Sequence, residues 1–397
     1  MNAYIIDAVR SPRGRGNDKG ALRTVKPAHL LAQTLQGLAQ RTQIDVAAIS
    51  DVMVGCVTQT GEQGTGIGKV AVMAAGWPDS VSALTINRYC ASGLAAVNLA
   101  ALYASYTDRC VIGAGLESMS RVPMLADKGP LFFDTEIAKQ VRVVHIGLAA
   151  DAIATVHRIS RAECDAYALQ SQSRAAAARA AGRFAPSLVP IRDHDGNVIL
   201  DADETIRADT TLEKLAAMAP AFAQIGLEGD DFLRRYFLLD RSIDHVHHMG
   251  NAPATADGAA AVLLAPASML DGRLRARARV LGIGEAAIDP VRMLTGAVEA
   301  AHQALAKAGL KSSDIGVFEV NEAFAAPTLQ TMQMLEADPA RFNINGGAIA
   351  LGHPMGATGA MLVSMLLDAL EERDERYGLA AAAGAAGLAS AIVVERL

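Results

Sequence analysis

The chain has 397 residues, more than one ordinary hydrophobic core holds, and this length predicts two or three domains. Apolar residues make up 51% and charged residues 20%, a balance typical of a globular protein, so we expect no membrane partner. The net charge of −6, without a basic stripe interleaved with aromatic residues, argues against a nucleic-acid partner.

The cysteines and the N-terminus indicate the compartment. The four cysteines, at positions 56, 90, 110 and 164, show no spacing typical of a disulfide framework or a metal site. The first ten residues reach an acidic side chain, Asp7, and lack the charged start and longer apolar core of a signal peptide. Both observations favour a reducing compartment, and we predict a cytoplasmic protein.

The first 118 residues alternate strand-like and helix-like segments. In chain order we predict a strand over 4–8, a helix over 29–39, a strand over 51–58, a helix over 67–75, a strand over 81–86, a helix over 94–106 and a strand over 109–115. Such alternation predicts a layered α/β domain.

Cys90 falls at the turn between the strand 81–86 and the helix 94–106. A strand-to-helix turn lifts a side chain out of the sheet, and the partial positive charge of the helix start favours thiolate over thiol. The small residues Ala91, Ser92 and Gly93 would let an acyl carbonyl approach the backbone N–H groups. Cys90 is therefore a candidate nucleophile, and the alternative is a small apolar cysteine buried under a helix.

Residues 119–248 lack the regular alternation of strands and helices, and Pro, Asp, Arg and short amphipathic segments predict an insertion with structure of its own. The clearest element is a helix over 161–181, with Ser160 as N-cap, Glu163 completing a capping box and Gly182 ending it. The insertion is either a passive lid or a ligand-binding region. We favour ligand binding because loops on a rigid scaffold commonly carry binding groups.

The α/β pattern returns after residue 251 and resembles the first half. We predict strands over 259–264 and 279–284, a helix over 291–309, a polar step and strand over 311–320, a strand-like segment over 342–347, a helix from the Gly352-His353-Pro354 turn to 370, and two strands over 379–397. The order of strand, turn and helix around His353 matches that around Cys90. The two halves therefore look like a duplication of one unit.

Three turns carry groups suited to acyl transfer. Cys90 is a nucleophile, and His353 is a base that titrates near neutrality and can take and return a thiol proton. Asn321 offers a side-chain amide that can hold a water or an oxygen in place. Each residue alone has a structural alternative, since a loop histidine can be structural and an asparagine can cap a helix.

Together these residues resemble the thiolase family over essentially the full length of the chain. The matching blocks are 7–12 (DAVRSP), 87–94 (NRYCASGL), 117–120 (ESMS), 321–324 (NEAF) and 345–354 (NGGAIALGHP), with further likeness at 167–171 and 209–215. The resemblance implies two similar halves in α/β/α/β/α layers with an inserted loop domain that covers coenzyme A. We therefore expect an N-terminal domain over 1–270, containing the loop domain 119–248, and a C-terminal domain over 271–397.

The resemblance also implies roles for individual residues. Cys90 would take the acyl group as a thioester, His353 would activate it, and Asn321 would hold a water that forms one oxyanion hole with His353. The backbone N–H of Cys90 would contribute to a second oxyanion hole. Coenzyme A would be a substrate rather than a tightly bound cofactor, and the protein would form a homodimer or homotetramer through the sheet edge near the Cys90 strand.

The sequence departs from the family pattern at its C-terminal end. Family members normally carry a second cysteine in a Cys-x-Gly motif, which moves the proton of the carbon nucleophile. Here Ala383 stands at the cysteine position and Ala385 at the glycine position, and residues 379–397 contain no Cys, His, Asp or Tyr. A general base contributes roughly 10²- to 10⁴-fold to a rate, so carbon–carbon bond formation and thiolysis would be impaired while acylation of Cys90 would not.

The resemblance implies four positions in coenzyme A placement, and, besides Ala385, the sequence departs from the family at one of them and beside another. They are His145, Ala252, Pro253 and Ala385; Pro253 replaces the usual serine, and Ile146 after His145 replaces the usual methionine. Phosphate recognition is weakly encoded, because the basic residues Arg207, Lys214, Arg234 and Arg235 of the insertion fit a solvated surface as well as an anion site. The histidines 245, 247 and 248 lack the spacing of a tetrahedral metal site.

These features predict a thiolase-type acyl-CoA acyltransferase of fatty acid metabolism with an acyl-Cys90 intermediate. One alternative is a divergent acyl-CoA hydrolase, in which water replaces the carbon nucleophile. The other is a catalytically silent thiolase-like protein that binds coenzyme A.

Overall fold

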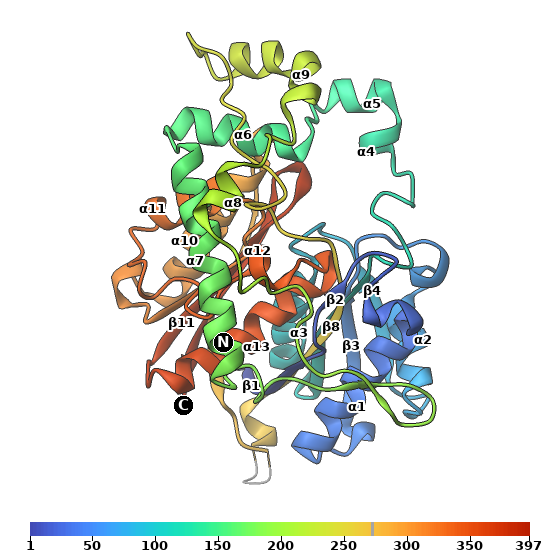
Figure 1. Cartoon of the computed structure of the whole chain (residues 1–397). Helices are drawn as coiled ribbons and strands as arrows, with labels where there is room; N and C mark the ends of the chain where they lie inside the picture. The colour runs from blue at the N-terminus through green and yellow to red at the C-terminus, as the bar shows by residue number, and fades with distance from the viewer. Residues whose placement is uncertain (271–273) are drawn as a thin grey trace.

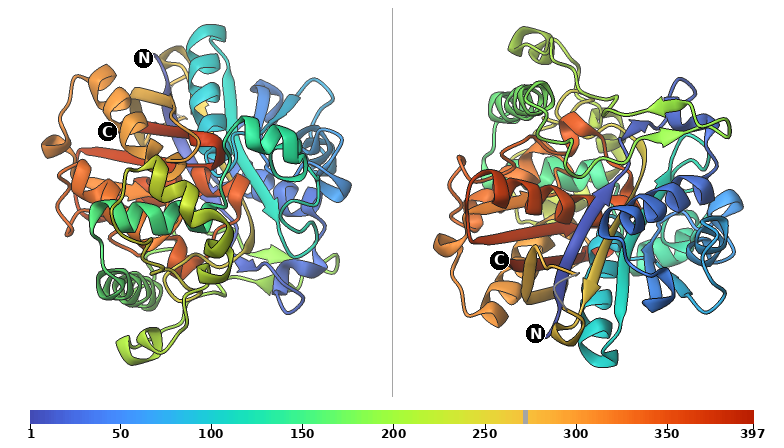
Figure 2. Two further views of the ribbon diagram at one scale, coloured as in Figure 1. Left: turned by 90° about the horizontal axis from the view of Figure 1, so that it is seen from above. Right: turned by 90° about the horizontal axis from the view of Figure 1, so that it is seen from below.

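The computed structural model describes residues 1–270 and 274–397, and one mixed sheet runs through it (Figure 1). The strands lie in the order β4-β3-β5-β8-β1-β9-β12-β11-β10. Their bounds are β1 Tyr4–Arg10, β3 Ile49–Gly55, β4 Ser82–Ile86, β5 Cys110–Ser118, β8 Ala256–Ala265, β9 Ala278–Ala287, β10 Val317–Val320, β11 Tyr377–Ala383 and β12 Leu388–Arg396, and the short β2 (Gly14–Arg15) pairs with β8. Strand β1 joins the halves, since it pairs with both β8 and β9 (Figure 2).

Two helices lie between the halves of the sheet. They are α3 (Ser92–Thr107) and α13 (Met355–Glu372), and one apolar cluster joins them to strands of both halves, such as β8 through Val262 and β12 through Ile392. Small and apolar side chains line α13 on all sides, and its residues from Met355 to Leu370 are buried, whereas α3 is buried on one face and exposes part of its C-terminal half. These helices form the middle layer of the molecule.

Further helices cover the outer faces. Helices α1 (Pro27–Thr42) and α2 (Ile67–Ala74) cover the strands of the first half, and α10 (Gly296–Ala308) covers those of the second. The molecule therefore has five α/β/α/β/α layers, and the predicted fold class is confirmed. The predicted helix 291–309 begins later than expected, because Met293–Thr295 form a separate 3-10 turn before α10.

The strand pairings repeat between the halves. Strand β3 pairs in parallel with β5, which pairs antiparallel with β8, and β10 pairs in parallel with β11, which pairs antiparallel with β12. Each of β3 and β10 follows a short 3-10 turn, Val46–Ala48 and Ser312–Asp314. The predicted duplication is thus visible in the topology.

The predicted strand over 342–347 is wrong. This segment is the counterpart of β4, but it makes only a single parallel bridge, from Phe342 to Phe318. The reason is Asn343, which adopts a positive φ of 46° and bonds the N–H and C=O of Val320 through its side chain at 2.8 and 2.9 Å. The side chain thus takes the backbone groups that a neighbouring strand would have paired.

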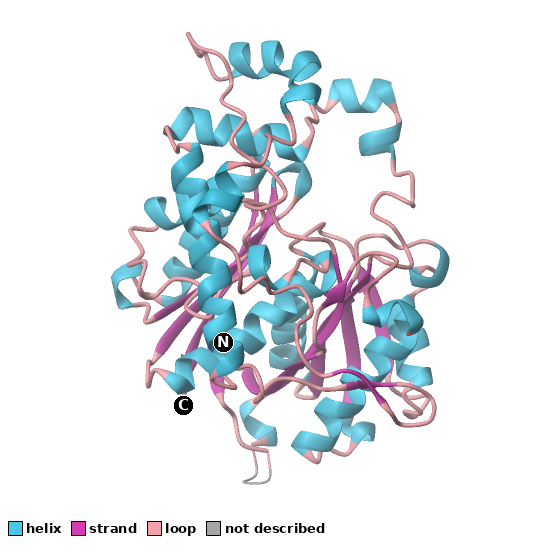
Figure 3. Ribbon diagram, viewed as in Figure 1, coloured by secondary structure: helices cyan, strands magenta, loops and turns pink. Residues whose placement is uncertain are grey.

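The segment between β5 and β8 contains α4 Pro130–Phe133, α5 Thr135–Gln140, α6 Ile146–His157, α7 Arg161–Ala180, β6 Ile191–Arg192, β7 Val198–Leu200, α8 Leu212–Ala216 and α9 Ala223–Tyr236. In this segment, the helices α4, α5, α6 and α9 gather at one end of the sheet, whereas the strands β6 and β7 lie beside α1, and long loops connect these elements (Figure 3). Ser160 and Glu163 form the predicted capping box of α7. Within the described residues, no helix has the length and apolarity needed to cross a bilayer.

Candidate active site

Cys90 lies in a tight turn between β4 and α3. Asn87 accepts a hydrogen bond from the N–H of Tyr89 at 2.8 Å, and Ser92 accepts one from the N–H of Arg88 at 2.7 Å. Tyr89 adopts a left-handed φ of 49°, which costs energy for a bulky residue and is typical of functional turns. These contacts fix the position of Cys90 at the start of α3, as the sequence predicted.

Cys90 is 9% exposed and lines a cavity of about 360 Å³. The walls of this cavity are mostly apolar; they include Val57, Leu125, Leu131, Phe132, Ile146, Met293 and Met355. Burial and the negative charge of Glu117 raise the pKa of Cys90 to about 12. The expected preference for thiolate at the helix start is therefore outweighed by burial, and the free site holds a neutral thiol.

His353 lies in the turn before α13, and its ring is held by that helix. Nδ1 lies 2.7 Å from the Oγ1 of Thr358, whose hydroxyl also donates to the Pro354 carbonyl at 3.2 Å. Because this single hydroxyl proton goes to the carbonyl, Nδ1 carries the ring proton and Nε2 keeps its lone pair. Nε2 is buried without a hydrogen-bond partner among the described residues.

The pKa of His353 is lowered to about 4, first by burial and then by the positive charge of Arg13. The imidazole is therefore neutral near pH 7. A neutral ring with a free Nε2 is the form that accepts a proton.

The starts of α3 and α13 touch through their backbones. A Cβ atom at Gly93 would lie 2.6 Å from the carbonyl oxygen of Gly356, so only glycine fits this contact. Cys90 precedes Gly93 by three residues, and His353 precedes Gly356 by three residues. Met355, next to this contact, packs in one apolar cluster with Cys90. The duplicated fold thus brings the two candidate catalytic turns to one place.

Glu117 fastens this junction. Its buried carboxylate accepts hydrogen bonds from the N–H groups of Val57, Thr58 and Gly356 at 3.0, 3.1 and 2.9 Å and from the side chain of Gln63 at 2.8 Å. The carboxylate therefore ties the loop after β3 to the first turn of α13. Sequence reasoning used Glu117 only as part of a motif, and its place at the end of an apolar strand was the available signal.

Asn321 follows β10 and is 6% exposed. Its backbone N–H donates to Ala381 of β11 at 2.9 Å, but neither Nδ2 nor Oδ1 has a partner among the described residues. Buried polar atoms are nearly always paired, and unpaired ones call for a functional or solvent partner. The next residue, Glu322, is fully engaged, because it accepts from Tyr167, Ser171 and the N–H of Ile349 at 2.8, 2.8 and 2.9 Å.

The four residues predicted for coenzyme A placement divide into two pairs. His145 and Ala385 line the Cys90 cavity. His145 caps α6 through Nδ1, which accepts from the N–H of Gly147 at 3.1 Å, and its ring packs against Phe222. Ala252 packs among apolar residues near the cavity, but neither it nor Pro253 is among the described residues that line it.

The end of β11 lies against the Cys90 turn. A Cβ atom at Gly384 would lie 3.0 Å from the backbone nitrogen of Cys90, and Ala383 immediately precedes this contact. Ala383 is buried in the apolar cluster on the α10 side of the sheet. The carboxylate of Glu395 is held at the other end of β12 by Arg279 and Arg376, at 2.7 and 2.6 Å, and cannot stand in for a base at this turn.

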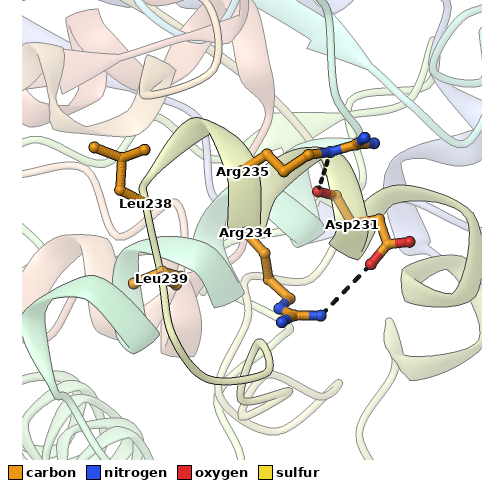
Figure 4. Close-up of a pocket in the computed structure, with 5 residues that line it drawn as sticks. All are labelled: Asp231, Arg234, Arg235, Leu238 and Leu239. Carbon is orange, nitrogen blue, oxygen red and sulfur yellow. Dashed lines mark hydrogen bonds and ion pairs between the residues drawn. The ribbon is translucent and has the colours of Figure 1, made fainter.

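The basic residues of the insertion do not converge on the Cys90 cavity. Arg234 and Arg235 border a surface hollow of about 520 Å³ at the end of α9 (Figure 4). Asp231 engages both of them, through its carboxylate to Arg234 at 3.6 Å and its carbonyl to Arg235 at 3.1 Å. Lys214 pairs with Asp209 at 2.6 Å.

The three clustered histidines bond to carboxylates that come from different helices. His245 and His247 bind Asp151 of α6 at 2.8 and 2.7 Å, and His248 binds Asp165 of α7 at 2.8 Å. Asp151 and Asp165 are buried, so these bonds fasten the segment after α9 to α6 and α7. The described residues contain no group of three or more side chains placed to hold a metal ion.

The fold and this site define a protein with a cysteine and a histidine at the joined helix starts of two similar α/β halves. The family model "Thiolase, N-terminal domain" matches residues 3–227, and "Thiolase, C-terminal domain" matches residues 274–396. The chain belongs to the thiolase family and is an acyl-CoA acyltransferase, as the sequence predicted.

Several characterised proteins resemble the chain over its full length. It is 39% identical to a 3-ketoacyl-CoA thiolase of Erwinia tasmaniensis over 406 residues and 38% identical to a β-ketoadipyl-CoA thiolase of Pseudomonas knackmussii over 417 residues, with 99% of each chain covered. It is 38% identical to a 3-ketoacyl-CoA thiolase of Escherichia coli over 409 residues, again with 99% of each chain covered.

Proposed function

We propose that this protein transfers acyl groups from acyl-CoA or 3-ketoacyl-CoA through an acyl intermediate on Cys90. The observation that carries the proposal is the contact between Gly93 and Gly356, which places the turns of Cys90 and His353 together beside an apolar cavity. The names of its relatives, 3-ketoacyl-CoA thiolase and β-ketoadipyl-CoA thiolase, support this substrate class. They also support a role in fatty acid metabolism.

In the acylation step, Nε2 of His353 takes the thiol proton of Cys90 and the sulfur bonds to the acyl carbon. The bond between that carbon and the coenzyme A sulfur breaks, and the departing sulfur takes the proton from His353. The free amide of Asn321 would hold a water that stabilises the intermediate oxyanion together with His353, and the backbone N–H of Cys90 would contribute to a second hole. In the free site, the raised pKa of Cys90 and the lowered pKa of His353 oppose proton transfer, so the bound thioester must drive it.

Coenzyme A enters as a substrate, and no tightly bound cofactor is required for this step. His145 and Ala385 in the cavity wall support placement of the pantetheine arm there. Ala252 and Pro253 would act at the margin of this path.

The step after acylation is where this chain departs from its family. Forming a carbon–carbon bond requires a base that removes a proton from the α-carbon of a second thioester, and Ala383 has no such group. We infer that condensation and thiolysis are slowed roughly 10²- to 10⁴-fold relative to an enzyme with a base at this position.

Mass spectrometry of the intact protein after incubation with acetyl-CoA tests the acylation. We expect a single acetyl adduct that maps to Cys90, that is lost in Cys90→Ser and that forms much more slowly in His353→Ala. The other cysteines, at positions 56, 110 and 164, are buried and serve as internal controls. An unmodified wild-type protein would refute the proposal.

A second candidate function, an acyl-CoA hydrolase, is favoured by Ala383. Water would give its proton to His353 and attack the acyl-Cys90 carbonyl, releasing a carboxylic acid and restoring the thiol. Release of free coenzyme A from acetyl-CoA beyond one equivalent, without an added acceptor, would support this reaction. A protein that binds coenzyme A without forming any adduct would instead be a silent family member.

We further propose a homodimer or homotetramer in the cytoplasm. Strand β4 is an edge strand, and α3, which follows it in the chain, exposes Leu99, Leu102, Tyr103 and Tyr106. An open edge strand and an exposed apolar stripe are both suited to contact with a second copy of the chain. Light scattering should give a multiple of the 41.4 kDa chain mass, and Leu102→Asp should reduce the measured mass.

The division into domains at residue 270 also remains a prediction.

A further inference from the structure

Arg13 is a buried cation without a matching anion. It is 2% exposed, and its guanidinium contacts only the sulfur of Met365, at 3.5 Å from Nη2. Nε and Nη1 have no partner among the described residues. Asp203 is adjacent but already engaged, since Arg10 takes both of its oxygens at 2.7 and 2.8 Å. Burying a charge without a partner is costly, so a position like this calls for a function.

Glu319 is an equally buried carboxyl group on β10. It is 0% exposed, and both carboxylate oxygens lack partners among the described residues. Its strand neighbours Phe318 and Val320 pack on the α10 side, so the Glu319 side chain points to the opposite face, where Val317 packs with α13. Glu319 and Arg13 therefore both face α13 from inside the protein.

The same helix carries the partner of the catalytic histidine. Thr358 binds Nδ1 of His353, and Met365, which contacts Arg13, follows it by seven residues. Two turns of helix put Thr358 and Met365 on one face, about 10 Å apart along the axis. The guanidinium thus packs on α13 two turns from the threonine that binds His353.

We propose that Arg13 is a positioning residue whose buried positive charge opposes protonation of His353, so that the ring stays available to accept the thiol proton of Cys90. The role rests on the proposed acylation of Cys90, but it is a property of the free protein. The effect of the Arg13 charge on the pKa of His353, which it lowers, has the required sign.

The neighbouring charged groups do not neutralise the guanidinium of Arg13. Arg10 and Asp203 form a closed pair, and Glu322 is bonded to Tyr167 and Ser171. Burial and the charge of Glu322 raise the pKa of Glu319 to about 8, so this carboxyl is mostly neutral at pH 7 and does not cancel the guanidinium. Arg174 on α7 also acts on Glu319, but it has no resolved effect on His353.

The test measures the titration of His353 in the free, full-length protein. NMR of ¹⁵N-labelled histidine monitors the ring protonation, and the His353→Asn variant assigns the signal. In Arg13→Met we expect the titration midpoint to rise by about one pH unit, the order of magnitude for the loss of one nearby buried charge. At pH 5 about half of the His353 rings would then be protonated, against about a tenth in the wild type.

Arg174→Met is the matched control, because it removes a cation near Glu319 from the other side. An unchanged midpoint in Arg13→Met, or equal shifts in Arg13→Met and Arg174→Met, would overturn the proposal. If Arg13→Met does not fold, the double variant R13M/E319Q is read in the same way, because it removes the buried cation and the buried carboxyl group together.

The rate of Cys90 acetylation against pH gives the functional readout. The acid limb of the wild-type profile should move to higher pH in Arg13→Met by the same amount as the NMR midpoint. If no acetyl-Cys90 forms but the NMR midpoint still shifts, the proposed function fails while the role of Arg13 stands. If acetylation occurs and the midpoint does not move, only the role of Arg13 fails.

Discussion

Oγ1 of Thr358 lies 2.7 Å from Nδ1 of His353 and also donates to the Pro354 carbonyl. The hydroxyl therefore selects the ring tautomer that leaves Nε2 free to accept a proton. Thr358 stands one turn into α13, so the helix that follows the histidine also orients it.

Replacing Thr358 by Val should slow acylation of Cys90 about 10- to 100-fold, because the ring loses its orienting partner while the general base itself remains. The rate of acetyl adduct formation, measured by mass spectrometry, checks this. Thr358→Ser keeps the hydroxyl and should retain most of the wild-type rate. Equal rates in the Val and Ser variants would show that Thr358 has no part in orienting His353.

The pH dependence of Cys90 alkylation should report a neutral thiol. Burial and Glu117 raise its pKa to about 12, so the thiolate fraction grows about tenfold per pH unit throughout the range from pH 7 to 9. Iodoacetamide labelling of the free protein should rise with this slope, with Cys90→Ser giving the background. A rate that is already constant above pH 7 would mean a preformed thiolate–imidazolium pair instead.

Much of this site could be predicted from local sequence. The turn around Cys90, the His353 turn and Asn321 after β10 all follow from alternating strand and helix patterns, and the structure places them at those element ends. The protonation of Cys90 could not be predicted, because it depends on Glu117 and on burial by the other half of the chain. The role of Arg13 could not be predicted, because an arginine three residues after a strand is expected to be exposed, and only the fold buries it against α13.

The strand predicted over 342–347 was wrong because its absence also depends on a tertiary contact. Its apolar and β-forming residues fit a strand, and the first half of the duplication has one at the matching position. The side chain of Asn343, however, occupies the backbone groups of Val320 that the strand would need. The hydrophobic pattern of a sequence does not show that a side chain will replace the hydrogen bonds of a neighbouring strand.

The ionisation of Glu319 should lower the stability of the protein as the pH rises. Its pKa is raised to about 8 in the fold from about 4.5, so the folded state holds a proton that the unfolded chain releases. Stability is then lost as the pH rises from about 4.5 to about 8. Glu319→Gln cannot ionise and should gain over the wild type across this window, by an amount on the order of 3 kcal/mol at pH 8.

Melting temperatures of both proteins between pH 5 and pH 9 measure this difference. The curves should meet near pH 5 and separate as the pH rises. Glu228→Gln, at an exposed position on α9, should follow the wild type throughout. Parallel curves for Glu319→Gln and the wild type would contradict the assignment.

Ala383 is the position at which this chain can be given the missing base. It ends β11 immediately before Gly384, whose backbone packs against that of Cys90. Ala383→Cys should raise the rate of thiolysis of acetoacetyl-CoA about 10²-fold or more, because a thiol can move the α-carbon proton that alanine cannot. Acetylation of Cys90 should be unaffected, because that step uses His353 alone.

Ala383→Ser is the matched control, because serine is nearly the same size as cysteine. Its hydroxyl is far too weak an acid to move the α-carbon proton. This variant should acetylate Cys90 and show no gain in thiolysis. If Ala383→Cys also gains nothing while still forming acetyl-Cys90, the carbon–carbon step has been lost for reasons beyond this side chain. In that case hydrolysis of the acyl-Cys90 intermediate becomes the reaction that the remaining groups can complete.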